Sequence, residues 1–263
     1  MHFIYRVIST AALLAAGAAA SAATIHVQFD NPLFTGVAAP TYDAVTITYP
    51  GQGGGSSVTT TVAAGRFQGT ASALVGIDPS VLVDNVADLY MYCYDLYEHV
   101  GGGWSADYTV NFTAETARTL DFLGAVNTVL SEGKAQVDPY AWLHPTNGLM
   151  GAAIQLGIWE SKYDSGDWSL SSGAFRAIGL ETQTASYLAS FLAARPSAAS
   201  LDGAYVMVLE AAGVQDMITG DPPGAVPEPG TLALAGLAGL ALVRRRQRGA
   251  KSSVSTSACA ASV

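Results

Sequence analysis

An apolar run followed at once by clustered arginines lies near the end of this chain and limits which residues can form a folded domain. The run covers residues 232–243, and the arginines are Arg244, Arg245, Arg246 and Arg248. Positive charge is held on the cytoplasmic side of a membrane, so this order is typical of a stop-transfer segment. The run is short for a complete span. We therefore predict a short transmembrane sorting segment at residues 231–243 and a basic cytoplasmic tail at residues 244–263.

The first residues of the chain form a second targeting segment. Residues 1–22 contain one early positive charge, Arg6, then an apolar stretch, and end on Ala20, Ser21 and Ala22. Small residues at this spacing are what signal peptidase accepts. We predict a secretory signal peptide, cut after Ala22, and export by the Sec route. The alternative, a permanent N-terminal anchor, requires a longer apolar run.

Between the two ends lies a strongly acidic mature region. We assign residues 23–220 to one domain and residues 221–230 to a linker, in a chain of 263 residues with a net charge of −9. Residues 23–226 hold 6 basic against 20 acidic residues, a net charge of −14. Nucleic-acid affinity comes largely from basic side chains that displace counterions. The composition therefore argues against nucleic acid as a partner.

The first half of the mature region has the composition of β-strands. Runs rich in β-branched and aromatic residues predict strands. These runs are residues 24–29, 44–49, 57–62, 89–97 and 108–112. The Gly-rich segment at residues 50–55 predicts a hairpin between the second and third strands.

The second half changes to helical periodicity. Apolar residues at helical spacing predict helices at residues 116–130, 149–163 and 181–194, and residues 203–209 return to a strand pattern. We therefore expect the fold class to be α+β, with a β-sandwich or barrel-like sheet that receives a helical insertion.

A three-part pattern at the C-terminus is more specific than its hydropathy alone. Pro227, Glu228 and Pro229 precede the apolar run and the arginine cluster. This order resembles the PEP-CTERM sorting signal. The resemblance implies a Gram-negative bacterium that produces exopolysaccharide, processing by an exosortase, transient anchoring in the inner membrane, and delivery to the cell surface or extracellular matrix. Signal peptidase and the exosortase are the partners expected during export.

Loss of the C-terminal tail would leave a single cysteine in the exported protein. The chain has two cysteines, and Cys259 lies beyond the sorting signal. The other, Cys93, is then unpaired in an oxidising compartment, where a free thiol is buried, paired with another chain, or used chemically. As a small apolar residue, Cys93 could simply be buried in the core.

The sequence around this cysteine resembles one part of a known signature. Cys93 lies between Tyr92 and Tyr94, and Gln155 lies in an apolar helical segment four residues before Trp159. These segments are similar to the Cys-Gln thioester domains of bacterial surface adhesins. In that family an aromatic-flanked Cys on a strand meets the Gln of a Thr-Gln-x-Ala-x-Trp-like motif.

The resemblance covers residues 88–165 and includes two departures from the family pattern. Ile154 stands where Thr is usual and Gly157 where Ala is usual, although neither supplies a reacting atom. The resemblance implies a thioester cross-link between Cys93 and Gln155. Bond formation would need the fold to hold sulfur and carbonyl in near-attack geometry.

The implied function is covalent capture, with each molecule reacting once, so the protein is not expected to be an enzyme. An amine or hydroxyl group of a surface protein or polysaccharide would attack the thioester carbonyl and release the Cys93 thiol. Side chains expected to exclude water from the bond are Tyr92, Tyr94, Ile158 and Trp159. For Gln155 the alternative role is a core amide bonded to backbone. For Trp159, simple core packing is the favoured interpretation.

Two other functions stay open. One is a passive matrix or carbohydrate-binding β-domain in which Cys93 is merely buried. The other is a hydrolase that pairs Cys93 with His144, although no family signature surrounds His144 and we expect both it and His99 on solvated loops.

No cofactor or metal is expected. The acids Asp95 and Glu98 with His99, or Asp164 with Asp167, lack a recognisable ligand spacing. We expect these acids to be exposed residues of loops.

Overall fold

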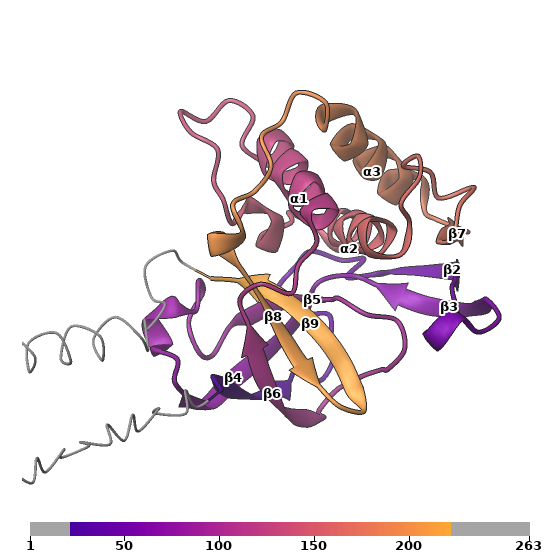
Figure 1. Ribbon diagram of the computed structural model, residues 1–263. Coiled ribbons are helices and arrows are strands. Elements are labelled where there is room, and N and C mark those ends of the chain that lie inside the picture. Colours follow the sequence, from indigo (N-terminus) through magenta and orange to yellow (C-terminus); the bar gives the residue numbers. More distant parts are fainter. Residues whose placement is uncertain (1–21, 222–263) are drawn as a thin grey trace, which may run out of the picture. The chain divides into compact units, whose positions relative to one another are not determined.

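The computed structural model describes residues 22–221, which contain the whole acidic domain (Figure 1). The predictions for the signal peptide, the Pro227-Glu228-Pro229 motif, the short transmembrane segment and the basic tail lie outside these residues. Among the described residues, no helix combines the length and apolar character that a membrane span requires.

Six antiparallel strands close into a barrel in the order β1-β4-β5-β9-β8-β6. Their bounds are β1 Thr24–Phe29, β4 Phe67–Val75, β5 Leu89–Cys93, β6 Ser105–Asn111, β8 Val206–Ala211 and β9 Val214–Gly220. Alternate side chains of β1 show why the sheet closes: Ile25, Val27 and Phe29 are buried, while His26 and Gln28 are not. This period of two gives the barrel an apolar interior.

A smaller sheet lies beside the barrel and has the order β3-β2-β7. Its strands are β2 Asp43–Tyr49, β3 Val58–Ala64 and β7 Arg176–Ile178. The hairpin expected between the second and third strands is confirmed, because β2 pairs with β3 from Asp43 opposite Ala64 to Tyr49 opposite Val58.

The insertion between β6 and β8 contains three helices and strand β7, and Figure 1 shows the helices gathered on one side of the sheets. They are α1 Ala117–Leu130, α2 Gly148–Tyr163 and α3 Thr182–Ala194. The side chain of Thr116 caps α1, and that of Asn147 caps α2 by accepting from the Met150 N–H. Residues 148–161 of α2 are all buried, so this helix packs on every side and brings side chains into the core.

Short 3₁₀ turns connect these elements at Gln52–Gly54, Pro79–Val81, Ala141–Leu143 and Gly203–Tyr205. The last of these corrects the expected strand at residues 203–209. The Asp202 side chain accepts from the Ala204 N–H and starts a turn, so β8 begins only at Val206.

The α+β class with a barrel-like sheet and a helical insertion is confirmed, but three strands were not predicted and one was drawn too long. Strand β4 contains Gly69, which reads as a strand breaker. A Cβ on Gly69 would lie 2.7 Å from the Gln28 carbonyl oxygen, so the close approach of β1 and β4 requires glycine here. The strand predicted to continue to residue 97 ends at Cys93.

Candidate functional site

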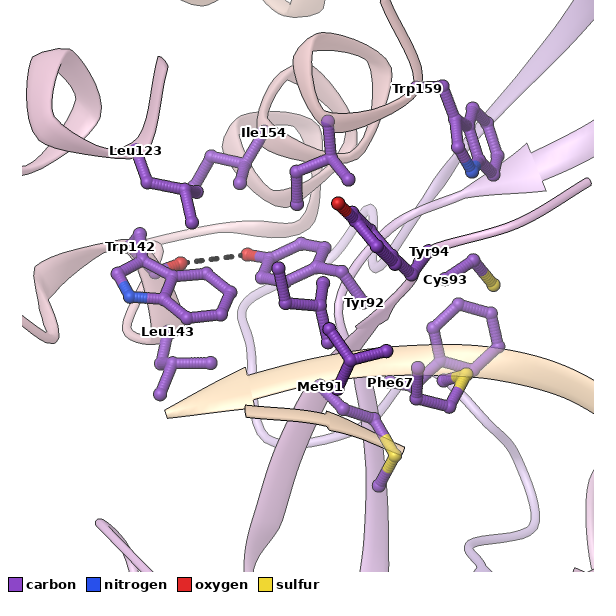
Figure 2. Close-up of a cluster of buried hydrophobic side chains, with 14 of the residues drawn as sticks. Phe67, Met91, Tyr92, Cys93, Tyr94, Leu123, Trp142, Leu143, Ile154 and Trp159 are labelled. Atoms are coloured by element: carbon purple, nitrogen blue, oxygen red, sulfur yellow. Dashed lines mark hydrogen bonds between the residues drawn. The ribbon is translucent and has the colours of Figure 1, made fainter. Parts of the chain in front are cut away.

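Cys93 is the last residue of β5, and its side chain faces the barrel interior. Successive strand residues point to opposite faces, so Met91 and Cys93 share one face while Tyr92 occupies the other. Figure 2 shows this alternation, with the Cys93 sulfur directed away from Tyr92 and toward the side of Phe67. Cys93 is a free cysteine with 2% of its surface exposed.

The Gln155 side chain reaches from α2 to the backbone of this same cysteine. The Cys93 N–H donates to Gln155 Oε1 at 2.8 Å, and Gln155 Nε2 donates to the Cys93 carbonyl at 2.8 Å. Gln155 is fully buried. The two residues that the sequence singled out are therefore neighbours, although the contact joins the amide to the backbone of Cys93.

Strand pairing explains why the Cys93 backbone is available to a side chain. The Tyr94 N–H donates to the Asp216 carbonyl of β9, and Tyr92 pairs with Ile218 of the same strand. The Cys93 N–H and carbonyl consequently point to the other neighbour, β4, which pairs with β5 only as far as Met91. Beyond that point the Gln155 amide takes the place of the missing strand.

The thiol borders a cavity of about 260 Å³ at one end of the barrel. Phe67, Trp159 and Gln215 line this cavity together with Cys93, and His99 and Glu98 lie at its loop side. Most of the remaining lining is apolar and comes from the hairpin β2–β3 and the loop after β5. The thiol therefore has a pocket beside it large enough for a small molecule.

Only Trp159, of the four side chains predicted to surround the bond, lines this cavity. The Tyr92 hydroxyl donates to the Trp142 carbonyl at 3.0 Å, and the Tyr92 ring stacks on the indole ring of Trp142 (Figure 2). The Tyr94 hydroxyl accepts from the Thr116 N–H at 3.0 Å. Both tyrosines thus fasten the segment around Cys93 to the helical layer, and neither lines the cavity beside the thiol. Their role in excluding water from the bond stays a prediction.

The two other predicted neighbours of the bond lie in the core. Ile158 is completely buried but does not line the cavity. Trp159 is 2% exposed and packs against Phe175 with ring centroids 6.3 Å apart. Core packing, the favoured interpretation of Trp159, is therefore confirmed, and the residue forms one wall of the cavity as well.

The two departures from the adhesin motif have a packing explanation. Ile154 is completely buried and joins the core cluster drawn in Figure 2 with Leu123. At Gly157 a Cβ would overlap the ring of Phe122, which is itself completely buried. The chain therefore uses a bulky apolar residue before Gln155 and no side chain two residues after it, because α1 packs closely against α2.

Burial controls the ionisation of the thiol. The pKa of Cys93 is raised well above 9.0, mainly because burial disfavours the thiolate and further because the negative charge of Asp95 is near. A nucleophilic cysteine of a hydrolase requires the opposite shift. The Cys93 thiol therefore stays protonated at neutral pH.

His144 is not placed to activate this thiol. Its Nε2 contacts Asp84 Oδ1 at 2.6 Å and its Nδ1 contacts the Tyr140 carbonyl at 3.0 Å. Its ring packs edge-on against Tyr90, which projects from the face of β5 opposite to Cys93. The structure does not bring together the Cys93–His144 pair that the sequence left open, and His144 lies on an exposed loop as expected.

The acids near Cys93 are not all exposed, contrary to expectation. Asp95 is 5% exposed, and burial together with the neighbouring Glu98 and Asp216 carboxyls raises its pKa from 3.8 to about 8. Within residues 22–221, no three His, Cys, Asp or Glu side chains are close enough to hold a metal ion. Asp164 instead accepts hydrogen bonds from the Gly166 and Ala174 N–H groups of its own loop.

Comparison with protein families finds the PEP-CTERM protein-sorting motif at residues 225–247. This match supports the predicted sorting signal, and implies export, transit through a membrane before surface sorting, and an exosortase as processing partner. No curated protein matches the chain, and no solved structure does either. None of these findings bears on the Cys-Gln resemblance, which stays a prediction.

Proposed function

We propose that this exported protein carries a thioester between Cys93 and Gln155 and acts as a covalent binding module for an amine or hydroxyl group. The observation that carries the proposal is the reciprocal pair of 2.8 Å hydrogen bonds between the Gln155 amide and the backbone of Cys93. The two residues are 62 positions apart in the chain. Their juxtaposition in a water-poor core is the arrangement that an intramolecular acyl transfer needs.

The same hydrogen bonds suit the chemistry of bond formation. The Cys93 N–H donates to Gln155 Oε1, where negative charge develops when sulfur attacks the amide carbon. The sulfur forms a bond to Cδ, the bond from Cδ to Nε2 breaks, and the thiol proton leaves with nitrogen as ammonia. For this step the sulfur must rotate about the Cα–Cβ bond, from the cavity toward the amide.

A protonated thiol suits a reaction that occurs once in each molecule. The raised pKa of Cys93 leaves little thiolate, which would make a turnover enzyme slow. Maturation to a thioester needs to finish only once, and its product contains no ionisable thiol. We therefore favour a single-turnover module and not a Cys-His hydrolase.

Capture then reverses the order of bonds. An amine or hydroxyl entering the cavity beside Cys93 attacks the thioester carbonyl, forms an amide or ester with the Gln155 acyl group, and frees the thiol. The partner would be a surface protein or a polysaccharide, and the result would be adhesion or attachment to the matrix. Sec export and release by the exosortase would deliver the domain to that location.

One observation favours a second candidate, a passive exported β-domain. Both polar atoms of the Gln155 side chain already have partners, so the residue also serves as a structural cap for the end of β5. In that case Cys93 is a buried thiol and any binding is reversible. The two candidates differ in chemistry, so reactivity toward a simple amine separates them.

The expected result with methylamine is incorporation at Gln155 and release of one thiol. Protein purified from the periplasm is treated with methylamine under native conditions, digested, and mapped by mass spectrometry. We expect methylamide on Gln155 and a newly titratable Cys93, with neither change in a Cys93→Ala variant. Label on other side chains, or a Cys93 thiol that titrates equally before treatment, would contradict the proposal.

A further inference from the structure

A second cavity, of about 360 Å³, has a strongly acidic lining. Carboxylates enter it from three parts of the chain: Asp95 and Glu98 follow β5, Glu210 belongs to β8, and Asp216 belongs to β9. The only basic side chain in its lining is Lys162 of α2. Four acids against one base leave an excess of negative charge when all are ionised.

Asp95 is the member of this group with a buried oxygen that lacks a hydrogen-bond partner. It is 5% exposed, and its Oδ1 atom is buried without any hydrogen bond. A buried carboxylate oxygen without a donor is costly, and native proteins rarely leave one unless it has a further role. Asp95 lines the cavity, so rotation of its carboxyl group about the Cβ–Cγ bond can present this oxygen to a donor bound there.

The other three carboxylates are held in place by uncharged donors. Glu98 Oε1 accepts from the Gly213 N–H at 3.3 Å. Asp216 Oδ1 accepts from the Ala211 N–H at 3.3 Å. The Glu210 carboxylate accepts from Asn111 Nδ2 at 3.3 Å and 3.4 Å. These contacts fix positions without neutralising charge, so the acids stay available to a cation.

Lys162 does not fill the cation position. Its Nζ lies 3.7 Å from the ring centroid of Tyr94, and within residues 22–221 it forms no ion pair with a carboxylate. Burial also lowers its pKa. The acidic cavity therefore has the Lys162 ammonium at one wall, and the remaining space is open to a further cation.

The spacing of the acids favours an organic cation. No three of them approach one another closely enough to hold a metal ion, whereas a primary ammonium group offers three donors at the end of an extended chain. The phenol rings of Tyr97 and Tyr163 also line the cavity and can contact methylene groups or an ammonium. We infer that this cavity is a reversible binding site for an alkylammonium group, and most favourably for a diammonium such as 1,4-diaminobutane.

Binding at this site should release protons. The charged groups that face Asp95 are Glu98 from its own loop, Asp216 from β9 and Lys162 from α2. The titratable groups near it that are uncharged at neutral pH are Cys93, Tyr49, Tyr108 and Tyr163. Burial and the two carboxyls raise its pKa to about 8, and Lys162 opposes them. A cation favours the ionised carboxylate, so it displaces the proton, and affinity should rise as pH increases toward 8.

This site does not depend on the thioester. Glu98 lines both this cavity and the one beside Cys93, so an ammonium bound here would lie next to the proposed reactive bond. The binding is non-covalent, however, and can be measured in a Cys93→Ala variant that cannot form a thioester. Failure of one proposal therefore leaves the other to be judged by its own measurement.

Calorimetric titration of 1,4-diaminobutane into the Cys93→Ala domain tests the inference. We expect saturable binding, proton release seen as a dependence of the heat on buffer, and affinity that is about tenfold or more weaker in Asp95→Asn. The matched control is Asp167→Asn, which removes the same charge from an exposed acid outside the cavity and should bind normally. Circular dichroism verifies that each variant is folded, and Glu98→Gln provides a second test if Asp95→Asn is not.

Three results would overturn the inference. One is the absence of saturable binding. Another is equal weakening by Asp95→Asn and Asp167→Asn together with loss of binding in moderate salt, which would indicate general attraction to an acidic surface. The last is displacement of the diamine by Ca²⁺ at a concentration below the one at which the diamine half-saturates the site. That result would show that the cavity binds a metal ion in preference to the diamine.

Discussion

Replacing Gln155 by alanine should destabilise the domain by about 2–6 kcal/mol, because two buried backbone groups lose their partners at about 1–3 kcal/mol each. The Cys93 N–H and carbonyl have no strand beside them on that edge, and Gln155 satisfies both. Such a loss is a large part of the stability of a typical domain. The measurement is urea unfolding followed by circular dichroism.

The comparison is made in a Cys93→Ala background so that a cross-link cannot contribute. Alanine at position 93 keeps the backbone N–H and carbonyl that Gln155 binds, so the effect of Gln155→Ala in this background reports the loss of these two hydrogen bonds alone. A Gln155→Ala effect below 1 kcal/mol in this background would mean that the amide does not cap β5.

The isosteric change Gln155→Glu adds a dependence on pH. The neutral carboxyl can accept from the N–H at position 93 and donate to its carbonyl, whereas the ionised form has no donor and is desolvated. Its pKa in the folded state is then raised above the unfolded value of about 4.3. The contribution of this group is fully present below that pH and is lost as pH rises through the folded pKa.

The free energy of unfolding, measured between pH 4 and 8, tests whether the introduced carboxyl loses its stabilising contribution as pH rises. The difference between Gln155→Glu and its Gln155 parent, both carrying Cys93→Ala, should grow as pH increases. Taking the difference removes the contributions of Asp95 and Glu160, whose pKa values are also raised by burial in both proteins. A difference that is constant with pH would show that the introduced carboxyl is solvated.

Replacing Gly157 by alanine should destabilise the domain by about 1–3 kcal/mol or more through overpacking. A Cβ at this position would overlap the Phe122 ring. That ring cannot retreat easily, because it stacks on Trp168 and meets Phe191 edge-on. Thermal unfolding should show a clear decrease in melting temperature.

Gly151→Ala is the matched control for this change. Gly151 lies in the same helix, and a Cβ there would be 3.3 Å from its nearest neighbour, the Arg66 backbone nitrogen. Both substitutions gain about the same helix propensity, up to about 1 kcal/mol. Only Gly157→Ala should be strongly destabilising, and Phe122→Leu should relieve part of its effect. Equal effects at the two glycines would contradict the close packing of α1 on α2.

Local patterns were enough to predict much of the fold. The strand Thr24–Phe29, the hairpin and the three helices follow from β-branched runs, a Gly-rich turn and apolar periodicity. Strand β4 could not be predicted in this way, because Gly69 is a strand residue only through its close contact with β1. Such tertiary requirements are not visible in local composition.

The candidate site was predicted in its members but not in its contacts. The resemblance to a known family predicted that Cys93 and Gln155 are neighbours. The hydrogen bonds between the Gln155 amide and the Cys93 backbone depend on where β4 stops pairing with β5, which the sequence does not show. The burial of Asp95 was not predicted either, because it also depends on tertiary contacts. Asp95 lies two residues after the end of β5, and this position in the sequence does not indicate which segments cover it. Cavities are lined by segments that are far apart in the sequence, so they cannot be predicted from the periodicity of apolar residues.

The intact mass of the exported domain tests the central claim most directly. Protein with its native Cys93 and Gln155, purified without amines or strong nucleophiles, should have the mass of its processed sequence minus one ammonia, and the deficit should vanish in Cys93→Ala. A mass equal to that of the processed sequence with no loss of ammonia, together with one titratable thiol after unfolding, would contradict the thioester. Gln155 would then be only the structural cap of β5.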